Sequence, residues 1–367
     1  MFINQNKYLD HSFFMKLALA QANKNLGNTS ENPSVGCVIT KNNSMIGAGC
    51  TGRSGRPHAE INAIKNSKNE IEGSNLYVTL EPCSHYGKTP PCTKSIIKRK
   101  IKKVFFSIND PDVRSYNKSF KLFSLHKVKI NKGVLKKQIY SFYRSYIKSK
   151  SNLLPFVTCK LAVSKDNFTV NKKSKWITNM FSRARVHLMR SNHDCILTTS
   201  ETIIADNPRL TCRINGLLET SPSRIILDTN LKVPLNSKII HDAKTYQTII
   251  FYNNFNKKKI SKLKKLNIKT YKINVDQENK FNLNEVLLKA KKLGFFRIFV
   301  ESGMKLITNF LNQNLVDDLI MFISKNKLGN NGKKNTKNNL KYFTKNKKKT
   351  LEKVNLFGDQ LIKYEIK

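Results

Sequence analysis

The chain has 367 residues, of which 39% are hydrophobic and 25% are charged, which supports two or three domains with buried cores and excludes wholesale disorder. No apolar run approaches the roughly 18 residues of a membrane span, and Lys16 interrupts the N-terminal apolar residues, which excludes a secretory signal peptide. The formal charge is +43, but it is spread evenly, with +18 over residues 1–150 and +25 over residues 151–367. Because 55 of the 67 basic residues are Lys and no region concentrates them, we expect Lys and Asn to fill exposed positions of a cytoplasmic enzyme or binding protein, and we expect neither a nucleic-acid nor a membrane partner.

Strand and helix patterns alternate in the first half of the chain. The N-terminal residues up to Ala22 predict an amphipathic helix. Predicted helices cover 13–25, 58–66, 93–100 and 135–147, and predicted strands cover 35–40, 45–48, 76–80 and 103–107. A polar stretch at 148–152, followed by Pro155, places a domain boundary near residue 150, so the expected domains are 1–150 and 151–367.

The second half alternates in the same way, which is typical of an α/β domain. Its predicted strands cover 156–161, 195–198, 224–227, 248–252, 297–300 and 319–324, and its predicted helices cover 180–190, 283–293 and 305–311. Residues 325–349 are rich in Lys and Asn, and we expect them to form an exposed loop. The seven Cys are odd in number and lie in a large chain, so we expect no disulfide framework.

One combination of residues predicts a catalytic zinc site. His58, Cys83 and Cys92 supply three ligands of the kind that zinc prefers, which leaves the fourth position for water. Glu60 lies two residues after His58 at a helix start, where its carboxylate can move the proton of that water without binding the metal. The alternative is a surface histidine and two core cysteines, but the combination with Pro82 and Pro91 before the cysteines favours a hydrolytic deaminase.

The spacing of the cysteines narrows the class of deaminase. Eight residues separate Cys83 from Cys92, whereas nucleoside and nucleic-acid deaminases usually have two. The string Pro-Cys-Ser-His-x-Gly-x-Thr-Pro-Pro-Cys at 82–92 resembles the bifunctional deaminase–reductase family of riboflavin biosynthesis. Asn-Pro-Ser-Val-Gly at 32–36 and Pro-His-Ala-Glu at 57–60 resemble the same family and occur in the same order.

The resemblance continues through the second half, at 160–164, 174–178, 202–213, 224–228 and 300–303. It implies a cytidine-deaminase-like N-terminal α/β/α domain and a dihydrofolate-reductase-like C-terminal α/β domain. It also implies one zinc ion per chain, NADPH as cofactor, phosphorylated pyrimidine substrates and a possible homo-oligomer. The residues it assigns to NADPH are Ala162, Trp176, Thr202, Asp206, Thr229, Gly303, Met304 and Lys305. Those it assigns to substrate are Asn32, His85, Lys88, Lys160, Ser174, Arg190, Leu210, Arg213 and Glu301.

Several of these residues keep a second interpretation on sequence alone. His85 and Lys88 either hold an anionic substrate or belong to a solvated loop. Trp176, the only Trp, covers an aromatic ring or anchors a core, and Arg213 holds a phosphate or pairs with Asp206 at the surface. The helix start at Gly303 offers backbone N–H groups to a dinucleotide phosphate.

The chain also departs from the family pattern in three turns. Asp-Asn-Phe at 166–168 replaces Asp-Gly-Lys/Arg, and Gly-Met-Lys at 303–305 replaces Gly-Pro-Thr. The loop at 110–119 has lost both of its family glycines. Two other functions therefore stay open: a tRNA or other nucleic-acid deaminase with an accessory basic domain, and a deaminase whose reductase-like domain is inactive.

Overall fold

The computed structural model describes residues 10–67 and 71–367, which form two compact units divided between Asn152 and Leu153. The expected boundary at residue 150 lies in the last turn of the helix that ends the first unit. The predicted N-terminal amphipathic helix is described only from residue 10 onward. No helix in the described ranges is long and apolar enough to cross a membrane.

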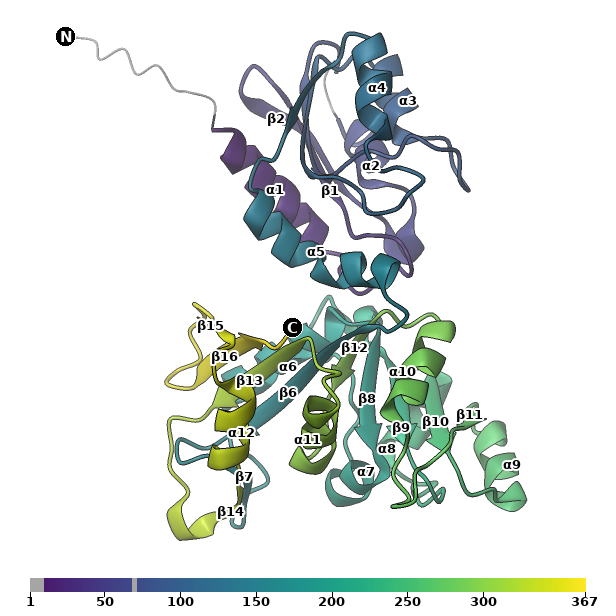
Figure 1. Ribbon diagram of the computed structural model, residues 1–367, viewed down its shortest axis with the longest axis vertical. Coiled ribbons are helices and arrows are strands. Elements are labelled where there is room, and N and C mark those ends of the chain that lie inside the picture. The colour runs from purple at the N-terminus through teal and green to yellow at the C-terminus, as the bar shows by residue number, and fades with distance from the viewer. Residues whose placement is uncertain (1–9, 68–70) are drawn as a thin grey trace, which may run out of the picture. The chain divides into compact units, whose positions relative to one another are not determined.

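The first unit is a five-stranded sheet between two layers of helices (Figure 1). Its strands are β1 (Gly36–Lys41), β2 (Ser44–Cys50), β3 (Asn75–Leu80), β4 (Lys103–Ile108) and β5 (Lys129–Lys132), in the order β2-β1-β3-β4-β5. Its helices are α1 (His11–Asn23), α2 (Ala59–Lys65), α3 (Cys92–Lys98), α4 (Lys118–Leu125) and α5 (Lys136–Ser151), with a 3-10 turn at Arg53–Gly55. β1 is antiparallel to both neighbours, whereas β3, β4 and β5 are parallel.

Two glycines bring helices close to this sheet. A Cβ on Gly36 of β1 would lie 1.8 Å from the backbone oxygen of Ala18 in α1, and one on Gly49 of β2 would lie 2.4 Å from the backbone nitrogen of Ala63 in α2. α1 and α5 pack on one face of the sheet, and α2, α3 and α4 on the other (Figure 1). Almost all residues of β3 and β4 are buried, and most of them are apolar, because helices cover both faces of the sheet.

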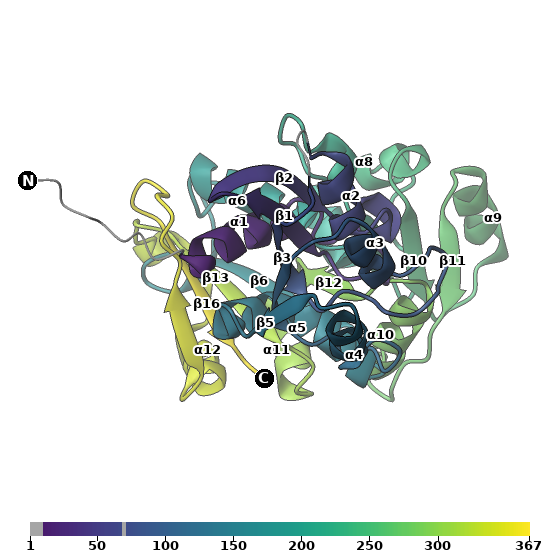
Figure 2. The ribbon, with the colours of Figure 1, turned by 90° about the horizontal axis from the view of Figure 1, so that it is seen from above.

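The second unit is built on a nine-stranded sheet in the order β11-β10-β9-β8-β12-β6-β13-β16-β15. Its strands are β6 (Phe156–Val163), β8 (Cys195–Thr199), β9 (Ser223–Leu227), β10 (Thr248–Tyr252), β11 (Lys269–Lys272), β12 (Arg297–Val300), β13 (Asp318–Ile323), β15 (Lys348–Leu351) and β16 (Gln360–Glu365). β7 (Phe168–Asn171) and β14 (Gly332–Asn335) form a separate antiparallel ribbon. Figure 2 shows β11 at one edge of this unit and β16 towards the opposite edge.

Helices cover both faces of the larger sheet. The helices are α6 (Met180–Ser191), α7 (Ser200–Asp206), α8 (Lys238–His241), α9 (Lys257–Lys265), α10 (Leu283–Lys292), α11 (Met304–Asn312) and α12 (Lys337–Thr344), with 3-10 turns at Leu218–Thr220, Asp242–Lys244 and Gly329–Asn331. Alternate residues of each strand enter two cores: Cys195 and Leu197 pack with α10, α11 and α12, while Ile196 packs with α6, α7, α8 and α9. This period of two is the pattern expected of a sheet covered on both sides.

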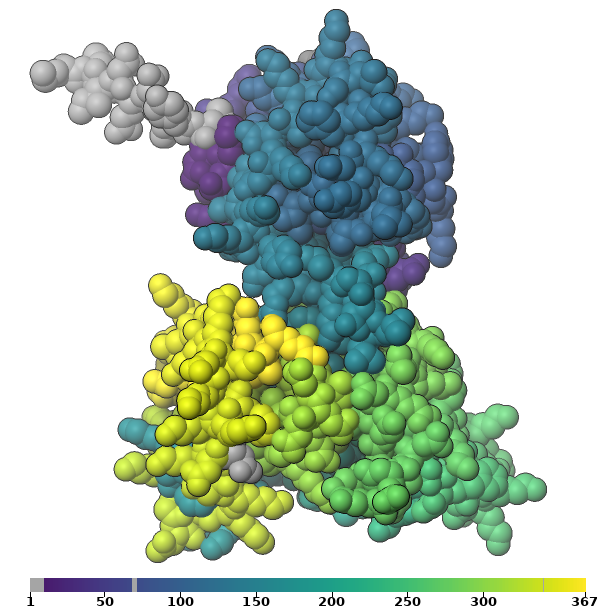
Figure 3. Space-filling model, viewed as in Figure 1, coloured from purple at the N-terminus to yellow at the C-terminus, as the bar shows by residue number. Residues whose placement is uncertain are grey.

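The prediction that residues 325–349 form an exposed loop is wrong. The segment contains β14, α12 and the first residues of β15, although most of its side chains are exposed at the surface of the second unit (Figure 3). Leu340 of α12 is buried in the core beside α10 and α11, and the half-buried Phe343 packs against the same core. All seven cysteines are free, as predicted.

Candidate functional site

The predicted zinc ligands come together in the first unit. His58 directly precedes α2, Cys92 is the first residue of α3, and Cys83 lies three residues after β3. His58 Nδ1 lies 3.3 Å from Cys92 Sγ and 3.5 Å from Cys83 Sγ, and the three potential ligand atoms lie within 4.8 Å of one another. A tetrahedral zinc ion would separate its nitrogen and sulfur ligands by about 3.6 Å, so the arrangement fits this metal.

The two thiols of the cluster differ in pKa. The pKa of Cys83 is lowered to about 4, because the thiol and the backbone N–H of Cys92 donate to its sulfur and His58 lies beside it. The pKa of Cys92 is raised, because its thiol donates to Cys83 and is buried. A thiolate is the form of cysteine that binds a metal, and the three side chains lie in one cluster.

Glu60 lies beside the cluster and is not one of its three ligands. It is the second residue of α2 and is almost completely buried. Burial raises its pKa to about 7, and the neighbouring Cys83 acts in the same direction. A carboxyl group with a pKa near neutrality can both accept and donate a proton at physiological pH.

The other predicted residues of the first unit differ in their burial and in their hydrogen-bond contacts. His85 is half-buried, and its Nδ1 lies 3.0 Å from Ser115 Oγ. Lys88 is exposed, and the Asn32 side chain donates to the backbone oxygen of Gly55 at 3.4 Å. Of the two predicted residues in the loop 84–91 between Cys83 and Cys92, His85 thus has a hydrogen-bond partner, the hydroxyl of Ser115.

Glu81 is a buried residue that sequence reasoning missed. Its carboxylate accepts backbone N–H groups of Asp110, Asn117 and Ser119 at 3.1–3.3 Å and the Ser119 hydroxyl at 2.7 Å. The sequence contained one indication of this role: Glu81 stands between a predicted buried strand and Pro82, and a buried carboxylate needs hydrogen-bond donors. Glu81 fixes the loop that has lost its two family glycines.

The residues that replace those glycines keep the loop folded. Asn117 has φ 59°, a left-handed conformation that Asn tolerates better than other side chains. Ser119 is fully buried and supplies the hydroxyl that Glu81 accepts. In the second unit Asn167 has φ 67° at the position where the family has glycine. The turns at Asn117 and Asn167 therefore keep the left-handed conformation without a glycine.

In the second unit, predicted site residues follow the carboxyl ends of adjacent parallel strands. Thr202 comes after β8, Thr229 after β9, and Glu301 and Gly303 after β12, while Lys160 and Ala162 lie on β6. The carboxyl ends of parallel strands meet at one edge of a sheet, which is where open α/β sheets bind ligands.

A buried ion pair lies at this edge. Arg190 of α6 binds Glu301 with both nitrogens, Nε to Oε1 at 2.6 Å and Nη2 to Oε2 at 3.0 Å. Burial acts to raise the pKa of Glu301, but Arg190 and the nearby Lys160 outweigh it, so the pKa lies below its ordinary value. Burial lowers the pKa of Lys160. Two residues predicted to bind substrate are therefore partners of each other.

Three hydroxyl groups also converge here. Thr199 Oγ1 lies 3.2 Å from Thr202 Oγ1 and 3.4 Å from Ser302 Oγ, and the last two atoms lie 3.2 Å apart. Gly303 is the N-cap of α11, and Met304 and Lys305 are its first two residues. The cluster adds Thr199 and Ser302, which sequence reasoning missed, to the predicted Thr202.

The remaining predicted residues of the second unit differ in exposure. Trp176 is 53% exposed and its ring centroid lies 4.6 Å from the Arg183 guanidinium, so its alternative role as a core anchor is wrong. Asp206 and Arg213 are both exposed and form no ion pair within the described chain, and Arg213 Nη1 lies 3.4 Å from Thr211 Oγ1. Ser174 is exposed and accepts the N–H of Trp176, and Leu210 is buried with φ 54°.

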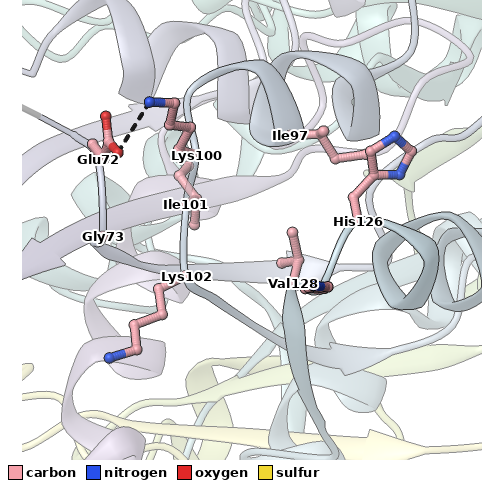
Figure 4. Close-up of a pocket in the computed structure, with 9 residues that line it drawn as sticks. Glu72, Gly73, Ile97, Lys100, Ile101, Lys102, His126 and Val128 are labelled. Carbon is pink, nitrogen blue, oxygen red and sulfur yellow. Dashed lines mark hydrogen bonds and ion pairs between the residues drawn. The ribbon is translucent and has the colours of Figure 1, made fainter.

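A separate pocket of about 320 Å³ opens at the other end of the first unit's parallel strands (Figure 4). Lys102 and Val128, which line it, come directly before β4 and β5, and its rim carries the ion pair of Glu72 and Lys100. The zinc ligand Cys83 follows the carboxyl end of β3 instead, so this pocket is not part of the candidate site.

Comparison with known proteins matches both units. The family model described as "Cytidine and deoxycytidylate deaminase zinc-binding region" matches residues 9–108, and "RibD C-terminal domain" matches residues 155–361. The riboflavin biosynthesis protein RibD of Aquifex aeolicus is 34% identical over 318 residues, which cover 86% of this chain and 87% of that protein.

The chain belongs to the RibD family. The solved structure of Acinetobacter baumannii RibD has a TM-score of 0.80 and 28% identity, covering 96% of this chain and 98% of that one. A Thermotoga maritima structure, described as a diaminohydroxyphosphoribosylaminopyrimidine deaminase/5-amino-6-(5-phosphoribosylamino)uracil reductase, has a TM-score of 0.80 and 27% identity over the same shares.

These matches confirm the predicted fold class and function. The chain has a deaminase-like N-terminal domain and a RibD-type reductase C-terminal domain, and it is a bifunctional deaminase–reductase of riboflavin biosynthesis. Relatives that match along most of the chain count against a nucleic-acid deaminase with an accessory basic domain.

Proposed function

We propose that the first unit removes the 2-amino group of 2,5-diamino-6-(5-phosphoribosylamino)pyrimidin-4(3H)-one by hydrolysis. The second unit then reduces the ribosyl group of the product, 5-amino-6-(5-phosphoribosylamino)uracil, to a ribityl chain with NADPH. The observation that carries this proposal is the convergence of His58, Cys83 and Cys92 beside buried Glu60. The Thermotoga maritima protein is described by the same two activities.

His58, Cys83 and Cys92 would hold one zinc ion per chain, which when bound supplies the Lewis acidity that lowers the pKa of water. Glu60 accepts a proton from the attacking water and delivers it to the departing amino group, so that the ring gains an oxygen and ammonia leaves. Its burial next to the ligands excludes bulk water as a competing proton source. His85, Lys88 and Asn32 would bind the pyrimidine phosphate.

In the second unit the hydroxyls of Thr199, Thr202 and Ser302 and the start of α11 at Gly303, Met304 and Lys305 would hold the phosphates of NADPH. NADPH supplies the hydride. Trp176, Ala162, Asp206 and Thr229 would complete the cofactor site. Lys160, Ser174, Arg190, Leu210, Arg213 and Glu301 would form the substrate site.

The test is incubation of the purified full chain with the diaminopyrimidine phosphate, with and without NADPH, read by mass spectrometry. Glu60→Gln should retain zinc and lose roughly 10²–10⁴-fold in deamination rate, while reduction of the supplied uracil intermediate continues. Arg213→Ala should weaken reduction and leave deamination unchanged. Glu72→Gln, which alters an exposed carboxylate of the same unit, is the matched control and should change neither rate.

Wild-type protein that deaminates but never consumes NADPH would leave the second unit as an inactive reductase-like domain. Loss of both activities in folded, zinc-loaded Glu60→Gln would contradict the assignment of separate sites.

A further inference from the structure

The loop of residues 84–91, between the two metal-binding cysteines, is held by side chains from two other segments. Arg56 Nη1 donates to Thr89 Oγ1 at 2.7 Å from one side. On the other side the hydroxyl of Ser115 lies 3.0 Å from His85 Nδ1. Neither Arg56 nor Ser115 belongs to the set of residues that the family resemblance assigned.

Ser115 is a fixed partner for the His85 ring. It is fully buried, and its backbone N–H donates to the Asp112 oxygen at 2.8 Å. Glu81 holds both ends of the same loop through the N–H groups of Asp110 and Asn117. A hydrogen bond with a fixed hydroxyl holds an imidazole ring in one orientation.

With Nδ1 engaged, the other ring nitrogen is left to face the loop. His85 Nε2 lies 4.0 Å from the point that a Cβ on Gly87 would occupy, and Arg56 Nη2 lies 3.9 Å from the same point. A Cβ at this point would meet both nitrogens only at ordinary van der Waals distance, so Gly87 leaves them unobstructed. The two nitrogens therefore border the same point of the loop.

We propose that Ser115 and Arg56 are positioning residues for deamination. Ser115 holds the His85 ring through its contact with Nδ1 and so presents Nε2 to the loop, and Arg56 fixes the loop through Thr89, so that this edge of the ring meets the anionic pyrimidine substrate. The inference rests on the proposed deaminase function, and it extends that function to two residues that act through the loop and need not touch the reacting atoms.

The kinetic test uses two double-mutant cycles on the full chain. Ser115→Ala should raise the deaminase KM roughly 3- to 10-fold, the range for loss of one hydrogen bond, with kcat within about twofold. The same change in a His85→Ala background should add nothing, because Ser115 acts through His85. Arg56→Gln and Thr89→Val should each raise KM, and their combination should be no worse than the larger single effect.

Zinc content and reductase kinetics are measured on every variant, because Arg56 Nη1 also lies 3.3 Å from His58 Nε2. Arg56→Lys should restore part of the Arg56→Gln loss. An unchanged KM in Ser115→Ala, or additive effects within either cycle, would overturn the proposal.

A second measurement separates this inference from the proposed function. Nitrogen NMR of full-length protein labelled with [15N]histidine should show a His85 Nδ1 signal shifted by its hydrogen bond with Ser115, and Ser115→Ala should remove that shift. A His85 signal unaffected by Ser115→Ala overturns the positioning role even if deamination is confirmed. Absence of deamination in wild type overturns the proposed function, whatever the His85 signal shows.

Discussion

Breaking the ion pair between Arg190 and Glu301 tests how the reductase unit tolerates buried charge. The two side chains are 11% and 10% exposed, and they meet through two hydrogen bonds. Arg190→Met leaves the Glu301 carboxylate buried, with Lys160 and Arg213 as nearby cationic side chains. Removal of one partner of a buried pair costs about 3–5 kcal/mol, and the remaining positive charge places the expected loss at about 3 kcal/mol.

For a unit of this size such a loss lowers Tm by roughly 6–12 °C, which differential scanning calorimetry of the full chain resolves. Lys280→Met is the matched control, because its ion pair with Glu278 has side chains that are 41% and 72% exposed. Exposed pairs contribute little to stability, so this control should shift Tm little. The double variant Arg190→Met/Glu301→Leu should recover part of the loss, because the buried carboxylate is removed while Lys160 loses it as a neighbour. Equal shifts for Arg190→Met and Lys280→Met would refute the reasoning.

Three further predictions use single substitutions. Asn117→Gly should be tolerated, whereas Asn117→Val should cost about 1–2 kcal/mol in urea unfolding, because φ 59° disfavours a β-branched residue; equal stability of the two variants would contradict this. Burial and the nearby Arg190 lower the pKa of His187 to about 4, so the fold favours the neutral ring, and the stability it contributes is full above pH ~6.5 and lost as pH falls towards 4. His187→Asn should therefore flatten the fall of Tm over this pH range, and an unchanged slope would count against it. Cys83→Ala should lose bound zinc by metal analysis while Cys50→Ala, whose thiol lies outside the cluster, retains it; full occupancy in Cys83→Ala would remove Cys83 from the ligand set.

The sequence predicted those parts of the fold where burial dominates. β3, β4 and β13 appear as short apolar runs because both faces of their sheets are covered, and their predicted and observed ranges agree within two residues. The three residues of the predicted zinc site could also be selected from the sequence, because their types and order suggest ligands without any knowledge of the fold, and the structure brings them together.

Elements with few buried residues could not be predicted in the same way. All four residues of β15 are exposed, and β11 is an edge strand with Lys at both ends. α12 has one buried leucine and one half-buried phenylalanine within a Lys-rich segment. Such elements are stabilised by pairing with neighbouring strands or by packing on a core formed elsewhere in the chain. Their own local sequence pattern therefore predicts them poorly.

The amino-acid composition did not reveal that Asn residues of this chain occupy turns with positive φ. We expected Lys and Asn to fill exposed positions, but Asn accounts for nine of the eighteen non-glycine residues with positive φ in the described chain. Asn117 and Asn167 occupy turns where the family has glycine. A chain rich in Asn can therefore replace glycine in left-handed turns without losing the turn.

The buried carboxylate of Glu81 has a consequence for affinity. It ties residues 110, 117 and 119 together through four hydrogen bonds, so the loop that carries Ser115 is ordered before any ligand arrives. Ordering a flexible backbone costs about 1–2 kcal/mol per residue, and a ligand that had to order this loop would lose that amount from its binding free energy. Folding has already met this entropic cost, and substrate contacts along the loop can therefore contribute almost their whole interaction energy to binding.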